Sequence, residues 1–247
     1  GWGEMLNVLD RMKLRYREEQ FHPGWLALFI NPFYFARVNL RDAVVAFAPR
    51  LSGRLLDVGC GSKPYRRFFD NEEYIGLDID NEVNRRAAIA DYFYDGSRFP
   101  FGDSTFDAVL CNEVLEHVFN PQEFLGEIRR VLKPGGCLLL TVPFVWDEHE
   151  QPYDFARYTT FGLKHLFEGQ NFQWLEHRKL GCDVSALFQL TNAYLFKIGC
   201  RLPKWGFLFL CISVMAAVNC FGALTRKLLP RNEDLFLDHV VLAMNGK

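Results

Sequence analysis

The sequence predicts an α/β fold of the doubly wound type, built on a mainly parallel sheet. Short apolar runs alternate with helical stretches between residues 51 and 183, which is typical of a parallel α/β sheet. One apolar run, Leu55–Val58, leads directly into a turn that contains Gly59 and Gly61. The chain has 247 residues, of which 49% are hydrophobic, so it can bury a sizeable core in one large or two small domains.

Seven apolar runs are predicted to form strands. They are Arg54–Val58, Tyr74–Leu77, Ala87–Tyr94, Phe106–Cys111, Cys137–Val142, Phe172–Arg178 and, near the C-terminus, Leu235–Met244. Helices or helical turns are expected between them, at Lys63–Phe69, Asn81–Arg86, Pro121–Leu132 and Thr160–Phe167. The third of these has the clearest boundaries, because Asn120 is a suitable N-cap, Pro121 suits the first helical position, and Lys133–Gly136 stops the helix.

Charge is distributed unevenly and suggests where the chain divides. Residues 51–183 carry 14 basic and 22 acidic side chains, whereas residues 184–232 carry six basic and none that is acidic. We predict an N-terminal helical cap at 1–50 and a main domain at 51–247, which includes a basic, apolar helical insert at 184–232. The total net charge of -2 argues against a nucleic-acid partner, since nucleic-acid-binding domains normally carry a basic excess.

The cysteines and the first residues favour a cytoplasmic protein. The seven cysteines are scattered and contain no CxxC pair, which indicates reduced, buried thiols rather than a disulfide framework. Met5–Gln20 is charged throughout, so no secretory signal is expected there. No group of carboxylates and histidines has metal-ligand spacing in the sequence, and we therefore expect no metal.

Three predicted strand ends carry residues suited to a nucleoside. Gly59 and Gly61 allow a tight turn and a close approach of the backbone to a ligand. Asp78 ends the next strand, where its carboxylate can accept hydrogen bonds from both ribose hydroxyls. Asp95 follows the third strand and can receive an adenine amino group. Pro64 stands where a dinucleotide-binding motif has its third glycine, which disfavours a dinucleotide enzyme.

A set of short motifs resembles the class I S-adenosylmethionine-dependent methyltransferases over about residues 51–180. The motifs are Leu55–Gly61, Gly76–Asp78, Asp95–Phe101, Ser104–Val109, Asn112–His117 and Arg130–Gly136. Each motif alone is weak, but their combination is specific. The resemblance implies a seven-stranded sheet of order 3-2-1-4-5-7-6 with strand 7 antiparallel, and S-adenosylmethionine as cofactor.

The same resemblance implies roles for individual residues. The methionine end would be held from below by Asp57, Gly59, Cys60 and Gly61, with Asn112 beside it. The ribose would be bound by Asp78. The adenine would pack on Ile79, and its edge would be bound by Asp95 and the Gly96 amide. His117, which ends the motif after the fourth strand, is expected to close a helix end rather than to take part in chemistry.

The segment 143–159 follows the fifth predicted strand and should overhang the carboxyl edge of the sheet. We predict His149 as the base that takes the proton of an acceptor hydroxyl, since histidine suits this role at neutral pH. Asp154 would orient His149 or bind an acceptor hydroxyl. Arg157 would hold an acceptor phosphate or carboxylate, or else pair with Asp154 to stabilise the loop. Glu150 and Tyr158 are further candidates for contacts with the acceptor.

This loop and Asn31–Arg37 together resemble methyltransferases of bacterial cell-surface polysaccharide gene clusters. That narrower resemblance implies O-methylation of a sugar in a glycan, a nucleotide sugar or a lipid-linked precursor, with residues 2–50 lying over the cofactor site. Two alternatives are a methyltransferase that acts on a quinone or another lipid or small molecule, and an inactive nucleoside-binding module that serves as a partner platform.

The insert is apolar enough to raise the question of a membrane. Trp205–Thr225 contains 21 uncharged residues, which is long enough to span a bilayer. A single crossing conflicts with the fold, however, because strands before and after the insert must join one sheet. The insert is therefore expected to be a buried helical hairpin, a homodimer interface, or a surface that contacts anionic lipid at the inner face of the membrane.

Overall fold

The computed structural model describes residues 15–16, 18–87 and 89–246, so the first fourteen residues of the predicted cap lie outside the described part. The chain divides into two compact units, which are described separately. The sheet unit comprises Ala43–Leu180 and the residues from Asp238 onward. The insert unit comprises the residues up to Asp42 together with Gly181–Leu237.

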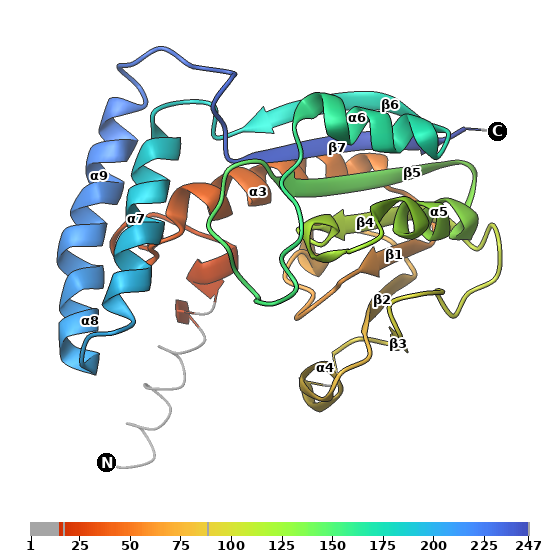
Figure 1. The fold of residues 1–247 in the computed structure, drawn as a ribbon, viewed down its shortest axis with the longest axis horizontal. Helices are drawn as coiled ribbons and strands as arrows, with labels where there is room; N and C mark the ends of the chain where they lie inside the picture. The colour runs from red at the N-terminus through yellow and green to blue at the C-terminus, as the bar shows by residue number, and fades with distance from the viewer. Residues whose placement is uncertain (1–14, 17, 88, 247) are drawn as a thin grey trace. The chain divides into compact units, whose positions relative to one another are not determined.

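The sheet unit has seven strands in the order β3-β2-β1-β4-β5-β7-β6 (Figure 1). The strands are β1 (Leu55–Val58), β2 (Tyr74–Ile79), β3 (Tyr92–Tyr94), β4 (Phe106–Asn112), β5 (Leu132–Pro143), β6 (Phe172–Leu180) and β7 (Asp238–Asn245). Strand β7 runs antiparallel to both of its neighbours, β5 and β6, while the other pairs are parallel. The predicted fold class and strand order are confirmed.

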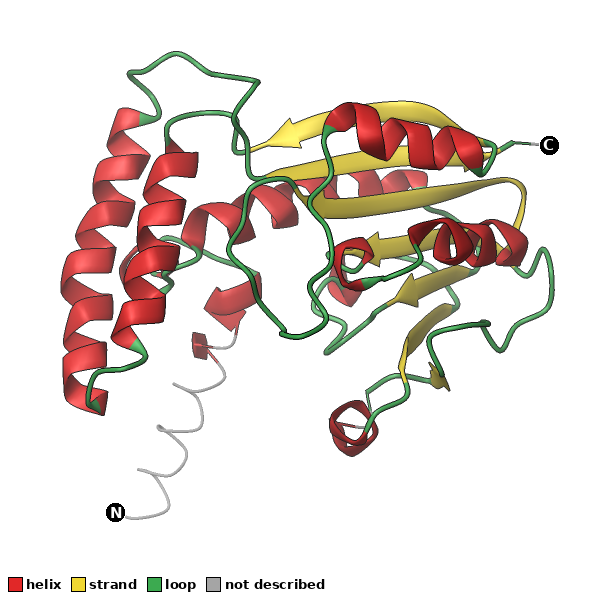
Figure 2. Cartoon of the chain, in the orientation of Figure 1, coloured by secondary structure: helices red, strands yellow, loops and turns green. Residues whose placement is uncertain are grey.

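Helices cover both faces of this sheet (Figure 2). Successive side chains of a strand point to opposite faces, so Leu56 and Leu55 belong to different core clusters. The first cluster includes residues of α5 (Pro121–Val131) and α6 (Thr160–Gly169). The second includes the last residues of α3 (Tyr34–Phe47) and the short helix η1 (Ala48–Arg50). Burial on both faces explains why the central strands β1, β4, β5 and β7 are largely apolar in the sequence.

Several predicted boundaries are wrong. The strand predicted at Ala87–Tyr94 is shorter in the structure. Its first residue, Ala87, is the last residue of α4 (Glu82–Ala87), and β3 begins only at Tyr92. The region predicted as a helix or helical turn at 63–69 contains the 3₁₀ turn η2 (Arg66–Phe68), which agrees with the prediction. Asn120 precedes α5, but its side chain makes no capping hydrogen bond and donates instead to Glu123 at 3.3 Å. The helix ends at Val131, and β5 follows immediately.

The insert unit is helical, with α2 (Ala27–Ile30), the first part of α3, α7 (Ser185–Gly199) and a continuous helical segment made of α8 (Lys204–Leu210), η4 (Cys211–Met215) and α9 (Ala216–Thr225). Buried amides join the insert to the N-terminal helices. Asn192 donates to Asn219 Oδ1 at 2.8 Å, and Asn219 donates to the carbonyl of Asn31 at 2.9 Å. Gln189 accepts from the amide of Phe35 at 3.0 Å. These hydrogen bonds between buried amides fix how the helices of this unit pack, although Oδ1 of Asn192 has no partner among the described residues.

The segment Lys204–Thr225 is long and apolar enough to cross a membrane, with a mean hydropathy of 2.2 in its apolar window. Only 22% of that window is buried. Large side chains such as Trp205, Phe209 and Phe221 are exposed. The first sequence option, a hairpin buried within the protein, therefore accounts for only part of this segment.

Candidate active site

The turn after β1 contains two glycines with different surroundings: the space beside Gly59 is filled, and the space beside Gly61 is empty of described atoms. Gly59 has a φ of 68°, and a Cβ placed on it would lie 2.4 Å from a methyl carbon of Val114. Its amide donates to the carbonyl of Leu77 at 2.8 Å, which ties the turn to β2. Gly61 has a φ of 48°, and among the described residues no atom lies within 4 Å of the position that its Cβ would take. The turn thus presents an accessible stretch of backbone.

Asp57 lies under this turn and is buried. The hydroxyl of Tyr74 donates to its carboxylate at 2.6 Å. Burial raises the pKa of Asp57 to about 7, although the hydrogen bond from Tyr74 and the charge of Lys63 act in the opposite direction. Desolvation disfavours the ionised form of the carboxyl group, so a cationic ligand nearby would favour ionisation.

Asp78 joins the end of β2 to the glycine turn. Its carboxylate accepts from the amide of Gly61 at 3.0 Å, and also from the amide of Ile79 and the side chain of Asn84. Burial raises the pKa of Asp78, while the hydrogen bonds from the Ile79 and Gly61 amides lower it. The predicted pairing of a glycine turn with an acidic strand end is therefore present in the fold.

The ends of β3 and β4 complete the same edge of the sheet. Gly96 follows β3 with a φ of 90°, and a Cβ on it would lie 3.5 Å from Cδ1 of the half-exposed Ile79. Asp95 accepts from the amide and the hydroxyl of Ser97. Asn112, at the end of β4, accepts from the hydroxyl of Thr141 at 2.9 Å. An apolar side chain, carboxylates and open backbone here suit a nucleoside that carries a charged amino-acid tail.

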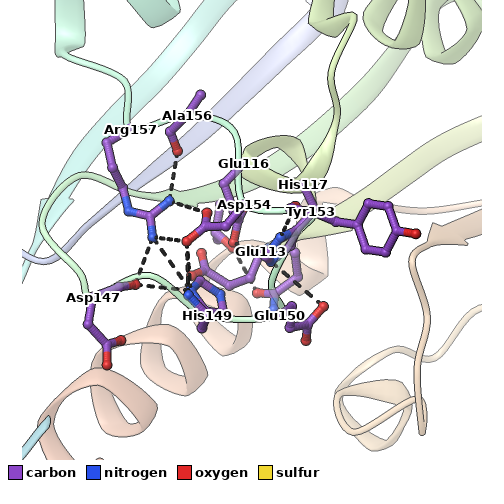
Figure 3. Close-up of polar contacts among 12 residues, drawn as sticks. Glu113, Glu116, His117, Asp147, His149, Glu150, Tyr153, Asp154, Ala156 and Arg157 are labelled. Carbon is purple, nitrogen blue, oxygen red and sulfur yellow. Dashed lines mark hydrogen bonds and ion pairs between the residues drawn. The ribbon is translucent and has the colours of Figure 1, made fainter.

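The loop between β5 and α6 is organised by Asp154 and Arg157 (Figure 3). The guanidinium of Arg157 donates to both carboxylate oxygens of Asp154, at 2.6 and 2.7 Å, and to the carbonyls of Asp147 and Ala156. This pairing lowers the pKa of Asp154 to about 2. The i,i+3 pair, one of the two predicted uses of Arg157, is present, while binding of an acceptor by Arg157 stays a prediction.

His149 lies beside this pair. Its amide donates to Asp154 at 3.0 Å, and its Nδ1 lies 3.2 Å from the carbonyl oxygen of Asp147. A carbonyl only accepts, so in the neutral tautomer that donates to Asp147, Nδ1 carries the proton and Nε2 keeps a lone pair. The guanidinium of Arg157, which only donates, lies 3.5 Å from the same Nδ1. Asp154 thus holds the backbone of His149, as well as lying 3.4 Å from its ring. The predicted role of His149 as base stays a prediction with which this tautomer is compatible.

The other two candidates from this loop differ in exposure. Glu150 has a φ of 49° and a side chain that is 74% exposed, with a carboxylate oxygen 3.9 Å from Nε2 of His117. Tyr158 is half-buried against the sheet core, and burial raises the pKa of its hydroxyl to about 12. Their predicted contacts with an acceptor stay predictions.

The fold also brings together three residues that linear spacing did not reveal. Glu116 and His117 lie in the turn η3 (Leu115–His117) after β4, and His149 comes from the loop after β5. One potential metal-ligating atom of each lies within 4.8 Å of the other two. Spacing along the sequence did not reveal this cluster, and the expectation that the chain binds no metal stays a prediction. An adjacent Glu-His pair just after a strand, with a histidine on the neighbouring loop, was the available signal.

Comparison with known proteins adds sequence evidence to this geometry. A family model described as "Methyltransferase domain" matches residues 56–140. A cycloartenol-C-24-methyltransferase of Oryza sativa is 35% identical over 61% of this chain and 43% of its own. A fatty-acid O-methyltransferase of Mycolicibacterium smegmatis is 35% identical over 42% of each chain. The chain thus spans less than half the length of these two relatives.

A solved structure has the same fold. It is a phosphoethanolamine N-methyltransferase of Haemonchus contortus in complex with S-adenosylmethionine, with a TM-score of 0.55 and 16% identity over 90% of this chain and 56% of the other. The chain carries a class I S-adenosylmethionine-dependent methyltransferase domain. Its cofactor is S-adenosylmethionine, and the residues of the edge fit that ligand, because Gly61 leaves open the space that a Cβ would fill and Ile79 presents an apolar surface.

The pKa of Asp57 leads to a pH-dependent stability. Because burial raises this pKa from its usual 3.8 to about 7, the folded state holds a proton that the unfolded chain has already released. The stabilisation by Asp57 is complete below about pH 4 and is lost as the pH rises to 7. Relative to Asp57→Asn, the wild-type free energy of unfolding should fall by about 2 to 4 kcal/mol between pH 5 and 8.

Urea unfolding of both proteins at pH 5, 6.5 and 8 measures this difference. Tyr74→Phe removes the hydrogen bond that favours the ionised form, so it should extend the decline to higher pH and increase its total size. Parallel pH profiles for wild type and Asp57→Asn would contradict the prediction.

Proposed function

We propose that this chain transfers a methyl group to an oxygen atom of a small lipid-like or lipid-linked acceptor. S-adenosylmethionine supplies an electrophilic methyl group when it is bound. The acceptor oxygen forms a bond to the methyl carbon, the carbon–sulfur bond breaks, and its electron pair remains on sulfur in S-adenosylhomocysteine. The hydroxyl proton must leave as the oxygen attacks, so an oxygen acceptor needs a group that acts on this proton.

The polar loop carries this proposal. In the tautomer that donates to Asp147, His149 keeps a lone pair on Nε2. Asp154, which is paired with Arg157, holds the backbone of His149 in place. Positioning of the acceptor oxygen against the methyl group would supply much of the rate. An anchored loop suits this task, because a misplaced oxygen loses the alignment on which the transfer depends.

The acceptor class is proposed from the relatives. One is named for a sterol-like substrate and one for fatty acids, and only the second is named as an O-methyltransferase. Neither is named for a sugar, so the sugar acceptor predicted from the sequence stays a prediction, as does a link to polysaccharide gene clusters. A lipid-linked sugar would agree both with a lipid-like acceptor and with the sugar acceptor predicted from the sequence.

Replacement of His149 tests the proposal. Methyl-labelled S-adenosylmethionine is incubated with the protein and a lipid extract, and labelled products are separated by class. His149→Gln should lower the turnover of an O-methylated product by about 10²- to 10⁴-fold, the usual contribution of an acid–base group. Affinity for S-adenosylhomocysteine, measured by calorimetry, should not change. His165→Gln, an exposed histidine on α6, is the matched control and should retain full turnover.

Other outcomes identify the alternatives. A C-methylated lipid whose formation survives His149→Gln would overturn the oxygen acceptor in favour of the carbon acceptor, which the sterol methyltransferase relative supports. Binding of S-adenosylhomocysteine without any labelled product, from either lipid or carbohydrate fractions, would favour the inactive nucleoside-binding module.

We also propose that the insert unit contacts an anionic membrane surface, which would place the chain at the cytoplasmic face. Strands β6 and β7 lie in one sheet, so both ends of the insert stay on one side of any membrane. Its exposed apolar side chains and six basic residues, with no acidic residue over 184–232, suit lipid acyl chains and anionic head groups.

Vesicle flotation tests this contact. The wild-type chain should float with vesicles that contain anionic lipid and should be released by high salt, since head-group attraction is screened. Lys204→Glu/Lys227→Glu should reduce flotation strongly, because each basic residue near the surface contributes about 1 kcal/mol. Arg98→Glu/Lys164→Glu makes the same charge change on exposed positions of the sheet unit and should float normally. Lipid-independent self-association through the insert would instead favour the homodimer.

A further inference from the structure

We propose that Glu116, His117 and His149 form a binding site for a divalent metal ion. The site itself follows from the arrangement of these side chains. Its part in catalysis, which is to act on the acceptor oxygen, rests on the function proposed above.

The three residues converge from two elements at the carboxyl edge of the sheet (Figure 3). One donor atom of each lies within 4.8 Å of the others. Nε2 of His117 lies 3.6 Å from Oε1 of Glu116, and the two imidazole rings meet edge to face with centroids 4.7 Å apart. Small shifts of these side chains would bring the donor atoms to the distances of about 2.0 to 2.2 Å at which Zn²⁺ is bound.

Glu116 provides an independent indication of a missing ligand. Its side chain is fully buried, and among the described residues neither carboxylate oxygen has a hydrogen-bond partner. A buried carboxylate without a donor is costly unless a cation or a proton compensates it. The nearby carboxyl group of Glu113 makes the surroundings more negative, while Arg157 offsets part of this charge. A metal ion would supply the missing compensation.

The tautomers of both histidines suit metal binding. Nδ1 of His117 lies 2.8 Å from the carbonyl oxygen of Tyr153, and Nδ1 of His149 lies 3.2 Å from that of Asp147. In the neutral tautomers that donate to these carbonyls, both rings keep their lone pair on Nε2. Histidines that ligate a metal usually donate their other ring nitrogen to a carbonyl or carboxylate in this way.

The donor set indicates the class of ion. Two imidazoles with one carboxylate suit Zn²⁺, Mn²⁺ or Fe²⁺ better than Mg²⁺ or Ca²⁺, which prefer oxygen ligands only. Three protein ligands leave coordination positions open for water or for an oxygen of the acceptor. A bound cation lowers the pKa of an oxygen that it contacts, so the hydroxyl proton could pass to solvent water. His149 would then promote transfer as a ligand rather than as the base.

Metal binding is measured first, without reference to activity. The full chain is stripped with chelator and titrated with Mn²⁺, with free ion followed by electron paramagnetic resonance and Zn²⁺ used as a competitor. One saturable site is expected. Glu116→Gln, His117→Gln and His149→Gln should each weaken binding at least about tenfold, whereas His165→Gln should bind as wild type does.

Controls separate loss of the site from loss of the fold. Urea unfolding identifies any variant that is not folded, and Glu116→Gln preserves the size of the buried side chain. The absence of a saturable site for both ions in the wild type, or binding that all three substitutions leave unchanged, would overturn the proposal.

Activity then tests the catalytic role. Chelator should abolish O-methyl transfer, Mn²⁺ or Zn²⁺ should restore it, and Glu116→Gln and His117→Gln should lose it together with His149→Gln. Transfer that resists chelator and Glu116→Gln but fails in His149→Gln would overturn the metal's role and support His149 as the base. Ion binding in a chain that makes no O-methylated product would overturn the proposed function and leave the metal site standing.

Discussion

Asp78→Ala is expected to weaken binding of S-adenosylhomocysteine by about 100-fold, because hydrogen bonds to a charged group contribute about 1.5 to 3 kcal/mol each. Asp78 occupies the end of β2 and would bind the ribose, as the class I resemblance implies. Calorimetric titration with S-adenosylhomocysteine measures the change.

Asp80→Ala is the matched control, since Asp80 lies two residues further along, is exposed and pairs with Arg85. This variant should bind with wild-type affinity. Asp78 also accepts hydrogen bonds from Gly61 and Asn84, so a modest fall in the unfolding free energy of Asp78→Ala is expected. Equal affinity of both variants for the ligand would contradict the assignment of the ribose site.

Two glycine substitutions in the same turn should affect different properties. Gly59→Ala should mainly lower the free energy of unfolding, and Gly61→Ala should mainly lower the affinity for the cofactor. Gly59→Ala combines a positive φ with a clash against Val114, and we expect it to lower the free energy of unfolding by about 2 to 5 kcal/mol. Gly61→Ala meets no atom of the described residues, so it should cost only about 1 to 2 kcal/mol for its backbone conformation. Its new methyl group would occupy space next to the exposed backbone, and cofactor affinity should fall at least about tenfold.

Urea unfolding with and without S-adenosylhomocysteine measures both effects. The ligand should raise the stability of the wild type but raise that of Gly61→Ala much less at the same concentration. Gly126→Ala, on α5 and outside the site, controls for a glycine replaced by alanine in this unit. Undiminished ligand stabilisation of Gly61→Ala would mean that the turn does not lie against the cofactor.

The sheet could be predicted because its strands have strong local signals. Leu55–Val58 and Leu138–Val142 are apolar apart from Asp57 and Thr141, since both faces of these strands are covered. The edge strand β3 was placed poorly because Tyr92–Tyr94 is short and its helical neighbour α4 is apolar at Ala87. The order of the strands came from the resemblance to a family, since sequence periodicity carries no information about which strands are adjacent.

The site was predictable in its cofactor half and less so in its acceptor half. Asp57, Gly61 and Asp78 lie at strand ends, and topology alone brings strand ends together. The neighbourhood of His149 depends on the path of an irregular loop, which no periodic pattern describes. Glu116 and His117 are 32 residues or more from His149 in the sequence, so their proximity is a tertiary property and the sequence did not predict the proposed metal site.

The position of β7 has a consequence for how the chain acquires its structure during synthesis. Strand β6 lies at one edge, and β7 is its partner in the sheet, yet the ribosome makes all of Gly181–Leu237 between them. Until β7 emerges, β5 and β6 each present an open row of backbone donors and acceptors, which is a recognised hazard for aggregation. Chaperone demand should therefore peak just before β7 is translated, and deletion of Asp238–Asn245 would make that vulnerable state permanent.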